Sequence, residues 1–69
     1  MTIETAKRAM RAKAPVDYDG TRYRRIVELI LWIDKDTDLM TYSAILESAY
    51  GNFTMRARLD SINLASPII

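Results

Sequence analysis

The segment from Phe53 to Asp60 alternates strictly between apolar and polar side chains. The apolar positions are Phe53, Met55, Ala57 and Leu59, and the polar positions are Thr54, Arg56, Arg58 and Asp60. Successive side chains of a strand point to opposite faces, whereas a helix would scatter this pattern around its circumference. Residues 53–59 are therefore predicted to form a strand, which needs a neighbour for its backbone hydrogen bonds. The nearest candidate is 41–49, joined to it by a turn at 50–52.

Two other apolar segments, 22–34 and 39–50, fit both a helix and a strand. The first has an apolar helical face, yet its isoleucine, valine, tyrosine and tryptophan content favours a long strand. The second would be a helix ending at Gly51, or a strand with Met40, Tyr42, Ala44 and Leu46 on one face. Because the strand at 53–59 requires a partner, we interpret both segments as strands.

The start of the chain predicts a helix over residues 2–13. Thr2 is a capping residue, and Ile3, Ala6 and Met10 recur at helical spacing. Pro15 disfavours helical geometry in the residue before it. Further on, Asp19-Gly20 predicts a tight hairpin turn, and 34–38 a polar loop.

The fold class predicted is α+β, mainly β, in a single domain over residues 1–69. A helix at 2–13 precedes an antiparallel β meander of five strands over 15–64, with a short last strand at Ile62 and Leu64 and a tail over 65–69. Long strands in so small a sheet twist and curl, so we expect an SH3-like small barrel or a bent meander. A small all-α bundle is the alternative.

Composition argues against an enzyme. The chain has no Cys and no His, which removes disulfides, a cysteine nucleophile and an imidazole base. Asp34, Asp36 and Asp38 have the spacing that opens a calcium loop, but Leu39 and Ile45 stand where glycine and glutamate are required. We expect no catalytic residue, no metal, no cofactor and no small-molecule ligand.

The longest apolar stretch, residues 26–33, is far shorter than the roughly 20 residues of a membrane helix and contains Glu28. The N-terminus lacks the apolar core of a secretory signal. We therefore expect no membrane association and a cytoplasmic location.

The arginines suggest a binding surface. Arg56 and Arg58 share one face of their predicted strand, and Arg22 and Arg24 share one face of theirs, with Tyr18 and Tyr23 nearby. If those strands are neighbours, the six side chains predict a surface for nucleic acid. The competing interpretation pairs these arginines with Glu28, Glu47 and Asp60, and a net charge of +1 favours it.

A protein partner, or self-association, is the favoured interpretation over nucleic acid. The apolar stripe of the helix is narrow and Ile68-Ile69 is an apolar tail. A domain of this length buries only about 60% of the surface of its unfolded chain, so a partner adds stability that the core alone lacks. The sequence predicts a small accessory module for protein–protein interaction.

Several segments also match a known type of protein. The matching residues are Glu4, Ala6, Lys7, Arg8, Pro15, Val16, Tyr18, Gly20, Tyr23, Arg25, Ile26, residues 44–47 and residues 53–57. At these positions the chain resembles short uncharacterised proteins encoded on conjugative transposons and other mobile elements of gut Firmicutes. It departs from them at SAYGN, residues 48–52, where they place a polar turn. The resemblance implies the β fold and no activity.

Overall fold

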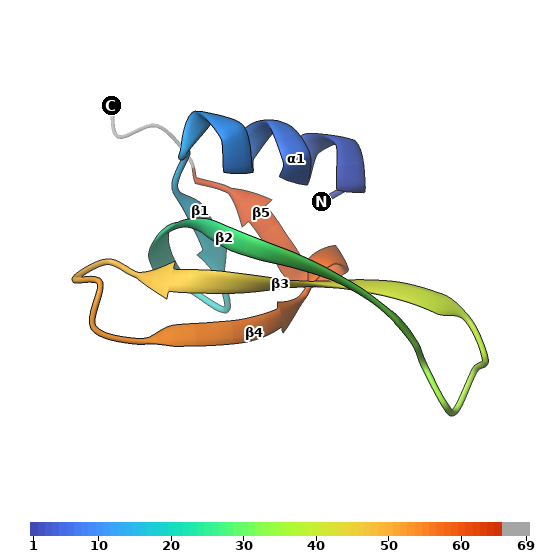
Figure 1. The fold of residues 1–69 in the computed structure, drawn as a ribbon. Helices are drawn as coiled ribbons and strands as arrows, with labels where there is room; N and C mark the ends of the chain where they lie inside the picture. The colour runs from blue at the N-terminus through green and yellow to red at the C-terminus, as the bar shows by residue number, and fades with distance from the viewer. Residues whose placement is uncertain (66–69) are drawn as a thin grey trace.

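The computed structural model describes residues 1–65, which form one helix, a sheet and a short 3-10 turn (Figure 1). In chain order the elements are α1 (Ile3–Ala12), β1 (Val16–Tyr18), β2 (Thr21–Ile33), β3 (Met40–Ser48), β4 (Thr54–Arg58), η1 (Leu59–Ser61) and β5 (Ile62–Leu64). The predicted tail at Ile68-Ile69 lies outside the described residues. None of the described helices has the length and apolar character needed to cross a membrane.

The helix forms where the sequence predicts it. The Thr2 hydroxyl accepts a 3.2 Å hydrogen bond from the backbone N–H of Thr5 and so caps the first turn. At the other end Lys13 adopts the left-handed conformation, with a φ of 54°, and its N–H bonds back to the last turn. Ala6 and Ala9 are buried, so the helix lies on the sheet through its smallest side chains.

The five strands form one antiparallel sheet in the order β4-β3-β2-β1-β5. The first four strands are a meander, and β5 returns to pair with β1 at the opposite edge (Figure 1). The α+β, mainly β prediction is therefore confirmed, and the all-α alternative is wrong. The sheet is not closed, which fits the bent meander. The last strand departs from the predicted succession, because β5 pairs with β1 and not with β4.

The turns follow local sequence signals. Asp19 and Gly20 have φ values of 50° and 77° and connect β1 to β2, as a two-residue hairpin turn requires. The strand predicted at 53–59 is present as β4, Thr54–Arg58, but it is shorter than expected. Its last predicted residue, Leu59, starts η1, which turns the chain toward β5.

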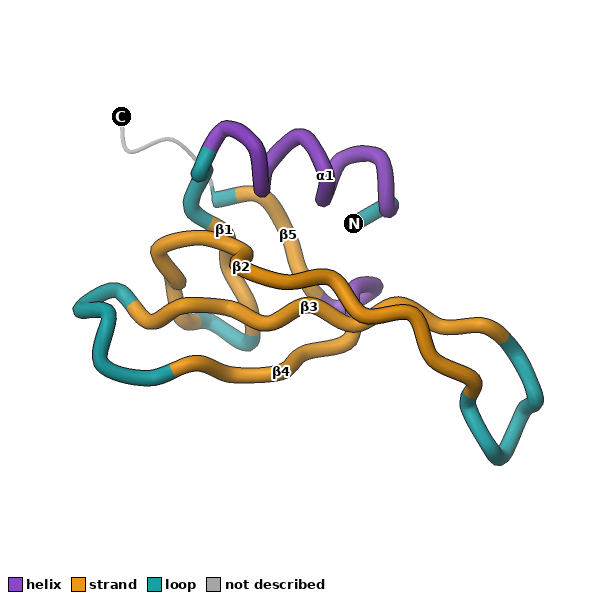
Figure 2. The backbone as a smooth tube through the Cα atoms, viewed as in Figure 1, coloured by secondary structure: helices purple, strands orange, loops and turns teal. Residues whose placement is uncertain are grey.

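The core lies between α1 and one face of the sheet. Its buried side chains are Ala6, Ala9, Val16, Tyr23, Ile26, Ala44, Leu46, Ala57, Leu59 and Ile62. Many of these are small, so the layer is thin. β2 and β3 continue past this layer as a two-stranded projection that ends in the loop 34–39 (Figure 2). We call this projection, residues 31–42, the arm.

Candidate functional site

One face of the arm exposes four large apolar side chains. Leu31 is paired with Tyr42 across the two strands, and Ile33 is paired with Met40. Their exposed fractions are 51% for Leu31, 38% for Tyr42, 54% for Ile33 and 60% for Met40. Cross-strand partners point to the same side of a sheet, so these residues form one contiguous apolar surface. We call it the arm face.

The arm face is the continuation of the core-facing side of the sheet. The pairing of β2 with β3 is regular from Glu28 to Ile33, so side chains alternate there without interruption. Leu29 and Ala44 lie on the same side and pack in the core. The apolar pattern thus runs beyond the part of the sheet that α1 covers, because the strands are longer than the helix can shield.

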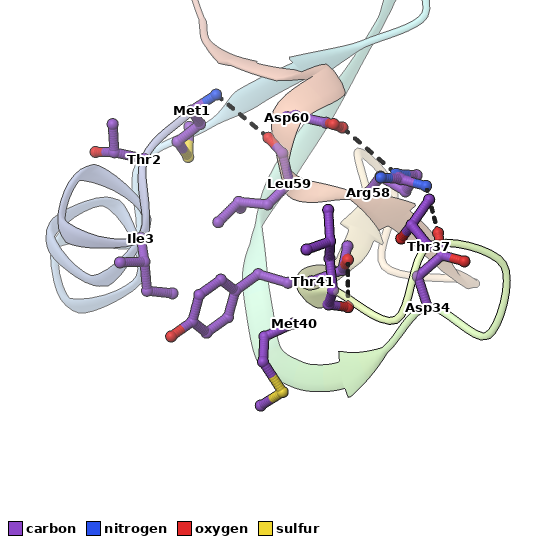
Figure 3. A pocket seen from close by; sticks show the side chains of 12 residues that line it. Met1, Thr2, Ile3, Asp34, Thr37, Met40, Thr41, Arg58, Leu59 and Asp60 are labelled. Atoms are coloured by element: carbon purple, nitrogen blue, oxygen red, sulfur yellow. Dashed lines mark hydrogen bonds and ion pairs between the residues drawn. The ribbon is translucent and has the colours of Figure 1, made fainter.

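An open groove of about 520 Å³ lies beside the arm face (Figure 3). It is bounded by the start of α1, the start of β3 and η1, with Ile3, Met40 and Leu59 around it. The Arg58 guanidinium lies at its edge, 3.6 Å from Asp34 and 3.7 Å from Asp60. The groove therefore has a mixed lining, in which three threonines and paired charges accompany the apolar side chains.

The tip of the arm is acidic. Asp34, Asp36 and Asp38 accompany a single Lys35, so the loop has a net charge of −2. The Asp34 carboxylate accepts a 2.9 Å hydrogen bond from the Asp36 N–H, which makes it part of the turn itself. No cluster of potential metal ligands occurs within residues 1–65. Asp36 and Asp38 are exposed, whereas the Asp34 side chain is only 17% exposed and lies 3.6 Å from the Arg58 guanidinium.

The arginines of the N-terminal half of β2 are engaged with carboxylates. Arg22 lies 3.0 Å from Asp17 on β1, and this hydrogen bond raises the pKa of the Arg22 guanidinium above its ordinary value. Arg24 and Arg25 both bond to the carboxylate of Glu47, each at 3.2 Å. This cross-strand pairing with Glu47 is one that the competing interpretation of the sequence expected.

The arginines of β4 lie on the sheet face opposite the helix. The Arg56 and Arg58 guanidinium carbons are 5.5 Å and 6.0 Å from the centre of the Trp32 ring, within reach of a cation–π attraction. Trp32 is half-buried, and its Nε1–H donates to the Ser43 hydroxyl at 2.8 Å. Arg56 makes no ion pair within residues 1–65, whereas Arg58 is held by Asp34 and Asp60.

The six residues proposed from sequence as a nucleic-acid surface are not brought together. β3 lies between β2 and β4, and a bulge at Arg24 breaks the alternation that would align it with Arg22. Tyr23 is buried and its hydroxyl donates to the Met55 sulfur at 3.0 Å. Tyr18 packs against the core. Neither ring accompanies Arg56 and Arg58.

The arm face was not identified from sequence. The sequence places Met40 and Tyr42 on one face of their strand, but the alternation of the four residues is the same as that of covered positions. The one signal available is the length of the apolar pattern, which extends on both strands well past what a ten-residue helix spans.

Comparison of the chain with protein-family models, with curated proteins and with solved structures finds no match.

Proposed function

We propose that this chain is a small, non-catalytic accessory protein that acts by binding another protein through the arm face. The observation that supports this most strongly is the exposure of Leu31, Ile33, Met40 and Tyr42 as one paired surface. Contiguous apolar patches on small proteins mark interaction sites, because leaving them in water is unfavourable. The groove beside the patch adds a concave surface for a partner to fill.

The proposed setting is a cytoplasmic protein encoded by a mobile element. The absence of Cys from the chain supports the location, and the resemblance described above supports the setting. The proposal of no catalytic activity rests on the absence of His and Cys from the sequence.

Nucleic-acid binding is the second candidate. Arg56, which has no carboxylate partner in the described part of the chain, is the observation in its favour. Against it, Arg22, Arg24, Arg25 and Arg58 each lie within 4.0 Å of a carboxylate. Phosphate binding would have to compete with those carboxylates, so we place this candidate second.

Site-specific photo-crosslinking in cells tests the proposal. A benzophenone amino acid replaces Tyr42 on the arm face or, as a matched control, Tyr50, which is 89% exposed on the turn after β3. We expect a discrete crosslinked protein from position 42 that disappears when Leu31→Asp and Met40→Asp are added. Equal crosslinking from both positions, or none from position 42, would contradict the proposal.

A further inference from the structure

We infer that the partner of the arm face is a second copy of this chain, with two arms packed face to face and antiparallel about a two-fold axis. This inference rests on the proposed function, since it names the protein that the arm face binds. It is argued from the symmetry of the apolar surface, from the distribution of charge and from the area that a stable dimer needs.

The arm face is suited to a partner identical to itself. Two cross-strand rows, Leu31 with Tyr42 and Ile33 with Met40, lie one after the other along the arm. In a dimer with a two-fold axis between the rows, the first row of each copy packs on the second row of the other. Every apolar side chain of the arm face is then covered. Met40 is unbranched and fills the irregular space between branched side chains.

Charge decides the relative direction of the two arms. Asp34 is paired with Arg58, but each tip still exposes Asp36 and Asp38 against a single Lys35, and parallel packing would bring two such tips together. Antiparallel packing instead places each tip beside the base of the other arm, where α1 begins (Figure 1). The helix and its C-cap residue have four exposed cations, Lys7, Arg8, Arg11 and Lys13, against one exposed acid, Glu4.

The nearer cations of the helix are well placed to meet the partner's tip. Side chains of a helix lean toward its N-terminus, so Lys7 and Arg8 extend back toward the start of α1. The carboxylates of Asp36 and Asp38 are exposed at the tip. The antiparallel dimer therefore makes the same acidic-to-basic contact twice, and the charge that repels two tips attracts a tip to a helix.

The area requirement brings the groove into the interface. A standard interface buries about 800 Å² of solvent-accessible surface on each partner. This is roughly a sixth of the accessible surface of this chain, which is 4985 Å². The arm is narrow, with only two strands, so the groove along it must also be filled. An arm seated on the arm face enters this groove, whose apolar lining residues include Ile3 and Leu59.

The exposed edge of the sheet is a less suitable route to a dimer. β4 is one of the two edge strands, and its polar side has Arg56 and Arg58. The other edge strand, β5, has only three residues. Pairing two β4 strands would bring four guanidinium groups together, a known device against edge-to-edge association.

Sedimentation velocity over a concentration series, from low micromolar to near millimolar, tests the inference. With rising concentration, the apparent mass of the wild-type chain should increase from the monomer mass of 7.9 kDa toward twice that value. Leu31→Asp with Met40→Asp should raise the dissociation constant about a hundredfold or more, because a carboxylate in a desolvated interface is strongly unfavourable. Tyr50→Asp, the same kind of change at an exposed position outside the arm, should leave it unchanged. Circular dichroism checks that each variant is folded.

Charge exchange keeps the test decisive even if the double aspartate variant fails to fold. Asp36→Lys with Asp38→Lys, and separately Lys7→Asp with Arg8→Asp, should each weaken the dimer about tenfold at low salt. An equimolar mixture of these two variants should recover association, since every tip then faces an oppositely charged helix.

A wild-type chain that stays monomeric throughout the series overturns the inference, as does a dimer unaffected by the arm substitutions or a charge-exchanged mixture that does not recover. A monomer that still crosslinks to a different protein through position 42 removes the second copy as partner and leaves the proposed function standing. A monomer with no crosslink at position 42 overturns both the inferred dimer and the proposed function.

Discussion

The indole Nε1–H of Trp32 on β2 donates a 2.8 Å hydrogen bond to the hydroxyl of Ser43 on β3, and that serine is almost completely buried. The contact lies at the base of the arm, on the sheet face opposite the arm face. It links β2 and β3 at the point beyond which α1 no longer covers the other face of the sheet. The two strands are therefore joined at the base of the arm by a side-chain contact as well as by the backbone ladder.

Ser43→Ala should lower the free energy of unfolding by about 1–2 kcal/mol, because the indole N–H loses its acceptor in a partly desolvated site. Urea denaturation followed by tryptophan fluorescence measures this change. Ser61→Ala removes an exposed hydroxyl whose only hydrogen bond within residues 1–65 is to Asp60 at 3.3 Å, and should change the free energy by less than about 0.5 kcal/mol. Equal losses in the two variants would mean that the Trp32 contact contributes nothing.

The turn between β3 and β4 is organised by the Ser48 hydroxyl. This oxygen accepts the N–H groups of Asn52 at 3.0 Å and Phe53 at 3.3 Å, and it bonds to the Asn52 side chain at 2.7 Å. Ser48→Ala should cost about 1–2 kcal/mol of unfolding free energy and broaden the amide signals of residues 49–53, since two backbone donors lose their acceptor. An unchanged amide spectrum would show that the backbone alone fixes this turn.

The end of α1 offers a stabilising substitution. Lys13 has a φ of 54°, a conformation that costs a side chain roughly 1 kcal/mol and glycine almost nothing. Lys13→Gly should therefore raise the free energy of unfolding by about 0.5–1 kcal/mol. Ala12→Gly, one residue earlier in the helix, should lower it by a similar amount. Thermal unfolding of both variants measures the contrast, and destabilisation by both would contradict the left-handed cap.

Local features of the fold were predictable because each depends on a few adjacent residues. Thr2 caps the helix as expected, and Asp19-Gly20 forms the first hairpin turn. The alternation after Phe53 identified β4, and the need of that strand for a partner then resolved the ambiguous segment before it. These inferences used capping, turn geometry and strand periodicity, which act over short distances.

The candidate site was less predictable because it depends on tertiary coverage. Alternation identifies a strand face but does not say whether a helix lies over it, so Leu31 and Met40 have the same pattern as the covered Leu29 and Ala44. The bulge at Arg24 is likewise not signalled by any glycine, and it separates Arg24 from Arg22. The predicted arginine surface required both regular register and adjacent strands, and neither condition holds.

Nucleic-acid binding has a direct test in the titration of a fluorescent single-stranded oligonucleotide at low and at physiological salt. Because most arginines of the sheet already face carboxylates, we expect no saturable binding at physiological salt. The double variant Arg56→Glu with Arg58→Glu serves as the comparison, and its titration should be the same as that of the wild-type chain. Binding that is steep in salt and lost in this variant would establish the second candidate function instead.

The central claim, that the arm face is the docking surface and a second copy its occupant, is tested most directly by isotope-filtered NMR. Equal amounts of ¹³C-labelled and unlabelled chain are mixed, and only contacts between copies are recorded. We predict intermolecular contacts from the methyl groups of Leu31, Ile33 and Met40, including contacts to the Tyr42 ring, with none from Tyr50. Intermolecular contacts confined to β4, or no intermolecular contact at a concentration near millimolar, would contradict the claim.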